Sequence, residues 1–84
     1  YIQIFYFIIQ KKIMKKTIRQ ILLKIKKVNF SDKDILTKKG YDSLDMLKLI
    51  TSIEASFKIK VTHKQMSKMS KKLNVENIVK ILKK

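Results

Sequence analysis

The sequence predicts an all-α fold, a small four-helix bundle with three longer helices and one short helix. Proline is absent and Gly40 is the sole glycine, so neither helix breaker interrupts the periodic segments. Apolar residues recur with a helical period in four of these segments. A length of 84 residues with 45% apolar content suits one small folded domain rather than a disordered chain.

The first thirteen residues, "YIQIFYFIIQKKI", differ in character from the rest. They are too short to span a bilayer, which takes about 20 residues. A truncated signal, a membrane anchor or a strand-like tail are alternatives, but "MKKTIRQ" from Met14 is typical of an ordinary protein start. We therefore interpret residues 1–13 as a non-native or disordered N-terminal extension and residues 14–84 as the folded domain.

The first two predicted helices have clear apolar stripes. One covers residues 17–27, and the loop 28–40 follows it. The second begins at or just after Ser43 and runs to about Phe57, with Gly40 allowing a turn before it. The residues expected in the core are Ile18, Ile21, Leu22 and Ile25 in the first helix, Val28, Phe30, Ile35 and Leu36 in the loop, and Leu44, Leu47, Ile50, Ile53 and Phe57 in the second helix, flanked by Met46 and Leu49.

The last two helices carry recognisable start signals. Thr62 is placed to cap the short third helix, in which Met66 and Met69 are expected to face the core. Asn74 is a good N-cap for the fourth helix. The apolar face of that helix comprises Val75, Ile78, Val79 and Leu82.

Composition excludes several kinds of chemistry. Cysteine is absent, and the single histidine, His63, lies among polar residues and cannot form a metal site alone. Ser43 has no nearby histidine base, glycine elbow or third triad member, so we expect no enzyme. Nothing in the sequence argues for secretion, and we expect a cytoplasmic monomer with no transmembrane segment.

The formal charge of +15 comes from 21 basic residues against six acids. Such a surface could attract nucleic acid or anionic membranes. However, the lysines are scattered, Arg19 is the only arginine, and four of the seven aromatic residues lie in the first seven positions. Nucleic-acid modules favour arginine and interleaved aromatics, so we expect no specific nucleic-acid partner.

The stretch "GYDSLDMLKLI" gathers acids around one serine in this basic chain. A serine at a helix start is usually an N-cap, whose hydroxyl accepts a backbone N–H bond. Alternatively, Ser43 is an attachment point. Because its own chain cannot activate it, another enzyme would have to do so.

Residues 40–61, "GYDSLDMLKLITSIEASFKIKV", resemble the core of the acyl carrier and peptidyl carrier protein family, whose members bind phosphopantetheine. The likeness extends over residues 17–82 and includes "NVENIVKIL", which is similar to the family's last helix. The matching positions are Gly40, Asp42, Ser43 and Leu44 in the signature, and Leu47, Leu49, Ile50, Ile53, Glu54 and Phe57 in the helix after it.

The resemblance implies that Ser43 carries 4′-phosphopantetheine, transferred from coenzyme A by a magnesium-dependent phosphopantetheinyl transferase. Asp42 would help to position the metal and coenzyme of that transferase, and Leu44 would lie at the attachment site. Leu44, Asp45 and Met46 would form a docking face for acyl-loading and acyl-processing enzymes. The expected function is an acyl or aminoacyl carrier that holds intermediates as thioesters in fatty-acid or specialised acyl biosynthesis.

The chain departs from the family in charge. Fatty-acid carriers are typically acidic, whereas this sequence has Lys48, Lys58 and Lys60 in and after its second helix. Reversed charge alters partner choice, so partners with apolar or acidic docking surfaces in a specialised pathway fit better. The alternative is an unmodified carrier-like helical module that binds an anionic surface or partner.

Overall fold

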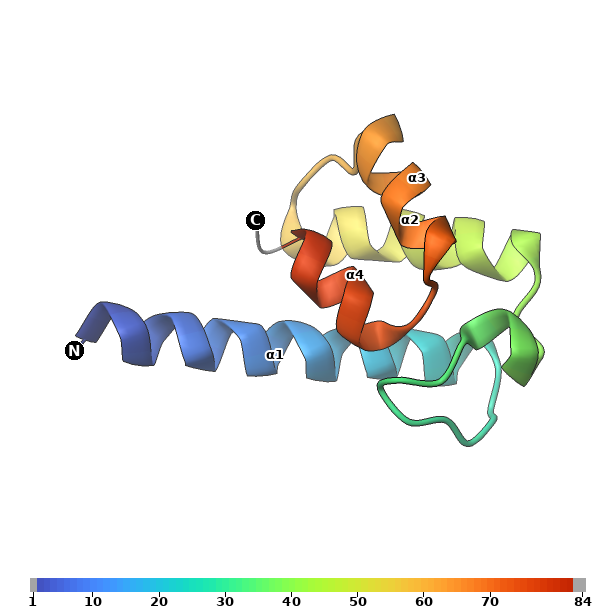
Figure 1. The fold of residues 1–84 in the computed structure, drawn as a ribbon, viewed down its shortest axis with the longest axis horizontal. Coiled ribbons are helices and arrows are strands. Elements are labelled where there is room, and N and C mark those ends of the chain that lie inside the picture. Colours follow the sequence, from blue (N-terminus) through green and yellow to red (C-terminus); the bar gives the residue numbers. More distant parts are fainter. Residues whose placement is uncertain (1, 83–84) are drawn as a thin grey trace.

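The computed structural model describes the backbone of residues 2–82 and the side chains of residue 4 and residues 10–82. Its helices are α1 (Ile2–Ile25), α2 (Ser43–Phe57), α3 (His63–Lys71) and α4 (Val75–Leu82), and a short 3₁₀ helix, η1 (Leu36–Lys39), precedes α2 (Figure 1). The described residues form no strand. The prediction of a small all-α bundle is confirmed.

Helix α1 is longer than the sequence pattern predicted. It begins at Ile2 rather than near Thr17 and spans 24 residues, because no proline or glycine precedes Gly40. Its N-terminal half projects beyond the other helices, and Ile4 and Ile13 are exposed there (Figure 1). In the structure this segment is helical, and its interpretation as non-native sequence stays a prediction. Within residues 2–82, no helix is long and apolar enough to cross a membrane.

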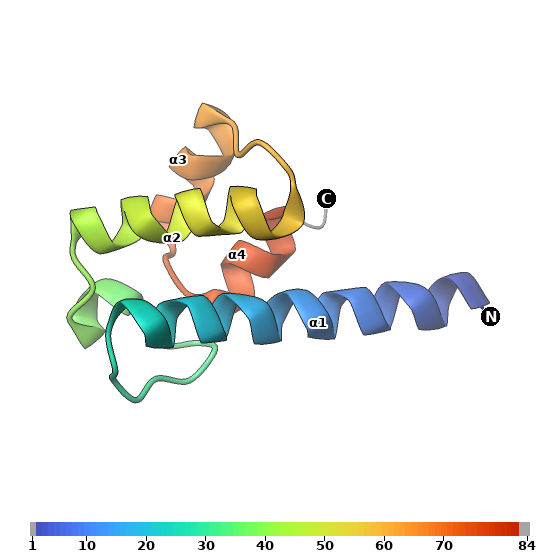
Figure 2. The same ribbon diagram turned by 180° about the vertical axis from the view of Figure 1, so that it is seen from behind.

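The core lies where α1 meets the two helices that pack on it. Helix α2 runs antiparallel to α1 (Figure 2), α4 packs on the same part of α1, and α3 packs on α4. The predicted faces of the first and last helices are confirmed. Their fully buried or nearly fully buried side chains are Ile18, Leu22, Val75, Ile78 and Val79, and Ile21, Ile25 and Leu82 pack partly buried against them.

The loop between α1 and α2 is held by polar as well as apolar contacts. Arg19 donates to the Asp32 carboxylate at 2.7 Å and to the Phe30 carbonyl at 3.0 Å, and its guanidinium lies 4.5 Å from the centre of the Phe30 ring. The backbone N–H of Leu36 donates to the Leu73 carbonyl at 2.8 Å. Phe30 and Leu36 are buried, as predicted, so the loop is fixed both to α1 and to the link before α4.

Helix α2 buries a different face from the one predicted. Leu49 and Ile53 are fully buried, whereas Leu44 and Leu47 are 59% and 62% exposed. Placing Leu44 and Leu47 in the core was therefore wrong. The line through Asp45, Leu49 and Ile53 faces the bundle, where Leu49 and Ile53 pack in the core and Asp45 has polar partners. Ile50 and Phe57 of the predicted stripe are half-buried beside that line.

The caps predicted for the last two helices are confirmed. The Thr62 hydroxyl accepts from the Gln65 N–H at 3.1 Å, in a capping box. The Asn74 side chain accepts from the Asn77 N–H at 2.7 Å. Glu54 accepts from the Val61 N–H at 2.9 Å, which ties the end of α2 to the link before α3.

The rotated face of α2 can be tested with two leucines in the same helix. Leu49→Ala should lower the free energy of unfolding by about 2–5 kcal/mol, because it leaves a cavity in the core. Leu47→Ala should lower it by less than about 1 kcal/mol, because its side chain is mostly in water. Urea denaturation followed by circular dichroism measures both. Equal losses would show that Leu47 is a core residue after all.

Candidate functional site

Two carboxylates form the start of helix α2. The Asp45 N–H donates to the Asp42 carboxylate at 2.9 Å, and the Asp42 N–H donates to the Asp45 carboxylate at 3.1 Å. This reciprocal pair is a capping box with Asp42 as the N-cap. The interpretation of Ser43 as the N-cap is therefore wrong, because Asp42 is the N-cap.

Ser43 is the first residue of α2 and is exposed. Within the part of the chain that the structure describes, its hydroxyl makes no hydrogen bond. The backbone N–H groups of Ser43 and Leu44 likewise have no acceptor there, as is usual in a first helical turn. The site thus presents a free hydroxyl beside two free backbone donors at the positive end of the helix dipole.

The turn before Ser43 is clamped to the end of α1. Gly40 has φ of +101°, a conformation that favours glycine. The Lys26 ammonium donates to the Gly40 carbonyl at 2.6 Å, and the buried Tyr41 hydroxyl donates to the Leu22 carbonyl at 2.8 Å. The roles of Lys26 and Tyr41 were not predicted. The position of Tyr41 between Gly40 and Asp42 in the sequence was the signal that could have indicated its role.

The charge at the site is balanced locally. Asp45 is only 8% exposed, and its carboxylate lies 3.4 Å from the Lys26 ammonium. The hydrogen bond from the Asp42 N–H, together with Lys26, keeps the pKa of Asp45 below its ordinary value despite burial. Burial, with the Asp45 charge nearby, raises the pKa of Tyr41. Both groups therefore keep their ordinary charge states at neutral pH.

An apolar pocket of about 550 Å³ opens beside Ser43. It lies between α2 and α3, whose backbones make no close contact in the described residues. Its lining combines Ser43 and Asp42 with apolar side chains of both helices, among them Met46, Leu47, Ile50, Met66 and Met69, and with Leu73 of the link after α3. Pockets that hold small molecules typically measure about 300–1,000 Å³, so this one could take an apolar chain. Met66 and Met69 were expected in the core, and they also line this pocket.

The predicted site residues lie together at the head of α2, but they do not all face outward. Asp42, Ser43 and Leu44 are exposed, and Met46 is half-buried in the pocket wall. Asp45, predicted to face a partner, is buried in the capping box. The prediction that Asp45 lies on an exposed docking face is therefore wrong, because its carboxylate accepts from the Asp42 N–H and pairs with Lys26.

Comparison with protein-family models finds no matching family, and comparisons with curated proteins and with solved structures find no match either. The function is therefore inferred from the residues around Ser43.

Asp42 caps α2 and Ser43 does not, so substitutions of these two residues should affect stability unequally. Asp42→Ala removes the side-chain cap and should lower the free energy of unfolding by about 0.5–2 kcal/mol. Ser43→Ala should change it by less than about 0.5 kcal/mol, because the hydroxyl is exposed and makes no hydrogen bond. Urea denaturation at neutral pH compares the two. A larger loss for Ser43→Ala would mean that its hydroxyl has a structural role.

The site also predicts a loss of stability in acid. The folded-state pKa of Asp45 lies below the unfolded value of about 4, so its stabilising effect is complete above pH 4 and disappears as the pH falls through the folded pKa. Asp32, whose pKa is lowered by Arg19 and Lys15 against an opposing effect of burial, acts in the same direction. Urea midpoints at pH 7 and near pH 3 should differ less for Asp45→Asn than for the wild type. An unchanged difference would show that Asp45 does not contribute.

Proposed function

We propose that this chain is a carrier protein whose Ser43 hydroxyl is esterified with 4′-phosphopantetheine by a separate transferase. One observation carries the proposal. An exposed hydroxyl that makes no hydrogen bond with the described residues stands at the first position of α2, beside an apolar pocket of about 550 Å³. The resemblance of residues 40–61 to the carrier family supports the same function.

The attachment is a group transfer in which the chain supplies only the acceptor. The Ser43 oxygen would form a bond to the phosphorus next to the pantetheine of coenzyme A. The bond from that phosphorus to the bridging oxygen would break, so that adenosine 3′,5′-bisphosphate leaves and the serine proton passes to the transferase. The transferase would supply the base and the magnesium ion for this step, and the chain would be its substrate.

The residues around Ser43 fit a phosphodiester. The N–H groups of Ser43 and Leu44 are free to donate to phosphate oxygens, and the helix dipole favours a negative charge there. The Asp45 charge is already offset by Lys26. One carboxylate oxygen of exposed Asp42 makes no hydrogen bond with the described residues, so it is available to the magnesium ion of the transferase. This chain has no cysteine and therefore no thiol of its own. When attached, the arm would supply the thiol that holds an acyl group as a thioester.

The apolar pocket supports an acyl or aminoacyl cargo with an apolar part. Leu47, Ile50 and Met69 would cover such a chain from the side of α2 and from the side of α3. Leu44 and Leu47, both exposed beside Ser43, would contact loading and processing enzymes. The pathway would be fatty-acid or specialised acyl biosynthesis in the cytoplasm.

A second candidate function is an unmodified helical module that binds an anionic surface or partner. A cavity between α3 and α4 favours it, because four lysines line that cavity. This function needs no chemistry at Ser43, so modification of the serine separates the two candidates.

Intact mass tests the carrier function. The protein is incubated with coenzyme A, magnesium and a broad-specificity phosphopantetheinyl transferase. The wild type should gain one phosphopantetheinyl group, and so should Ser56→Ala, which removes another exposed serine of α2. Ser43→Ala should gain none. A wild type that stays unmodified while a known carrier protein is modified in parallel would favour the binding module.

A further inference from the structure

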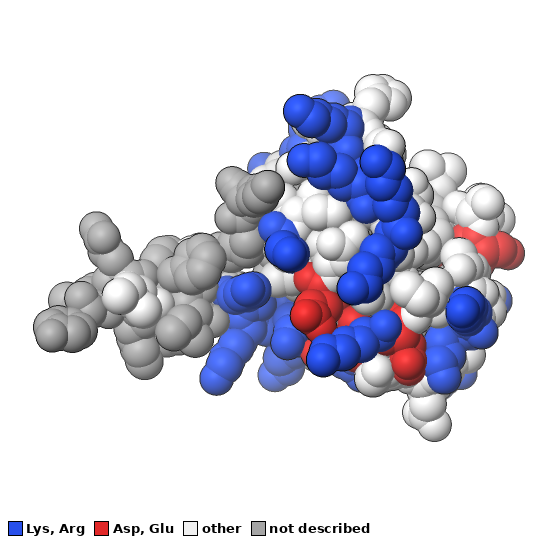
Figure 3. Space-filling view, viewed as in Figure 1, with Lys and Arg blue, Asp and Glu red and all other residues white. Residues whose placement is uncertain are grey.

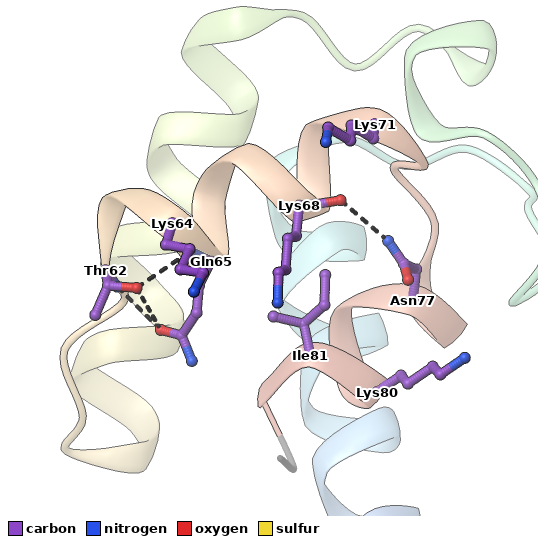
Figure 4. A pocket seen from close by; sticks show the side chains of 8 residues that line it. All are labelled: Thr62, Lys64, Gln65, Lys68, Lys71, Asn77, Lys80 and Ile81. Atoms are coloured by element: carbon purple, nitrogen blue, oxygen red, sulfur yellow. Dashed lines mark hydrogen bonds between the residues drawn. The ribbon is translucent and has the colours of Figure 1, made fainter.

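A groove rich in lysine lies on the side of the molecule formed by α3 and α4. It is a cavity of about 450 Å³ whose lining includes Lys64, Lys68 and Lys71 from α3 and Lys80 from α4 (Figure 4). We call it the lysine groove. On the face in Figure 3, lysine side chains gather over these two helices.

No lysine of the lysine groove forms an ion pair within the described part of the chain. Among the described residues, the ion pairs involve only Lys15, Arg19, Lys26 and Lys39 as cations, none of them from α3 or α4. Residues 55–75 contain six lysines and no acid. Lys64 and Lys68 are four residues apart on one helix, where like charges destabilise the helix. An anionic partner would relieve this repulsion.

The form of the groove favours an elongated anionic partner, such as one face of a helix, over a compact anion. Its lysines are exposed, and in Figure 4 their ammonium groups are spread along the groove rather than directed at one point. On α3 the lysines are spaced i, i+4 and i+7, so they follow one side of the helix over about 10 Å. Carboxylates on one face of a partner helix repeat with the same spacing.

The other anionic macromolecules fit less well. The groove lining has no arginine or aromatic side chain, and its Asn77 and Gln65 are hydrogen-bonded to the Lys72 carbonyl and the Thr62 N–H. Base stacking therefore lacks the aromatic side chains it needs, and bidentate readout by arginine is absent from this lining. No large apolar side chain described in α3 or α4 is strongly exposed, whereas binding at a membrane surface needs apolar insertion.

The lysine groove is joined to the serine site. Lys71 lines both the groove and the apolar pocket that includes Ser43, so a partner held in the groove would lie next to that pocket. We propose that the lysine groove docks an acidic helical segment of the enzymes that act at Ser43. This inference rests on the proposed function for the identity of the partner, whereas the binding itself can be tested without it.

The test measures binding of a fluorescent helical peptide of about 15 residues with glutamates at i, i+4, i+7 and i+11, a pattern that matches α3 in either direction. A peptide of equal composition with glutamates distributed around the helix is the control. The protein variants are Lys64→Gln/Lys68→Gln/Lys71→Gln and, with the same change in net charge, Lys11→Gln/Lys12→Gln/Lys16→Gln in α1. The corresponding arginine triple in α3 keeps the charge, and circular dichroism checks the fold of each variant.

The patterned peptide should bind more tightly than the control peptide, and the α3 glutamine triple should weaken it about tenfold. The α1 triple should change binding less than about twofold, and the α3 arginine triple should bind like the wild type. Equal losses for both glutamine triples would overturn the proposal in favour of net charge alone. Tighter, α3-dependent binding of single-stranded DNA or phosphatidylserine vesicles would assign the groove to those partners instead. Ser43→Ala should bind the peptide normally, so failure here is distinct from failure of the carrier function.

Discussion

The reciprocal hydrogen bonds between Asp42 and Asp45 are the contact on which the site depends. They cap α2 without using the Ser43 hydroxyl, and Lys26 offsets the charge of the buried member of the pair. A helix start without such a cap would need the serine hydroxyl for itself. Because the two aspartates form the cap, the chain can present the free Ser43 hydroxyl at a rigid position.

Charge is divided between structure and surface in this molecule. Asp32 is paired with Arg19 of α1 and Asp45 with Lys26, the residue after α1, and these pairs hold the loop and the turn in place. The lysines of α3 and α4 have no such partner among the described residues and face the solvent. A carrier with this distribution would select partners by charge opposite to that favoured by acidic carriers. Because Lys71 lines both the lysine groove and the apolar pocket, that selection would bear on the modification proposed at Ser43.

Helix periodicity was enough to predict the fold class, the start of α2 and the caps at Thr62 and Asn74, because these depend on local sequence. It did not predict how far α2 is rotated about its axis. A stripe through Leu47 and one through Leu49 are both apolar, so the choice between them depends on tertiary contacts, among them the packing of Leu49 and the pairing of Asp45 with Lys26. The apolar pocket was also beyond prediction, since it depends on the separation of α2 from α3. The length of α1 was underestimated because an apolar run without polar periodicity gives no clear helix signal.

The most direct test of the account is the state of Ser43 in the protein's native cells. Trypsin cleaves after Lys39 and Lys48, which releases residues 40–48 with Ser43 as their only serine. Mass spectrometry of this peptide from the endogenous protein should find phosphopantetheine on that residue. Recovery of the peptide solely in its unmodified form, from cells that modify their other carriers, would contradict the account.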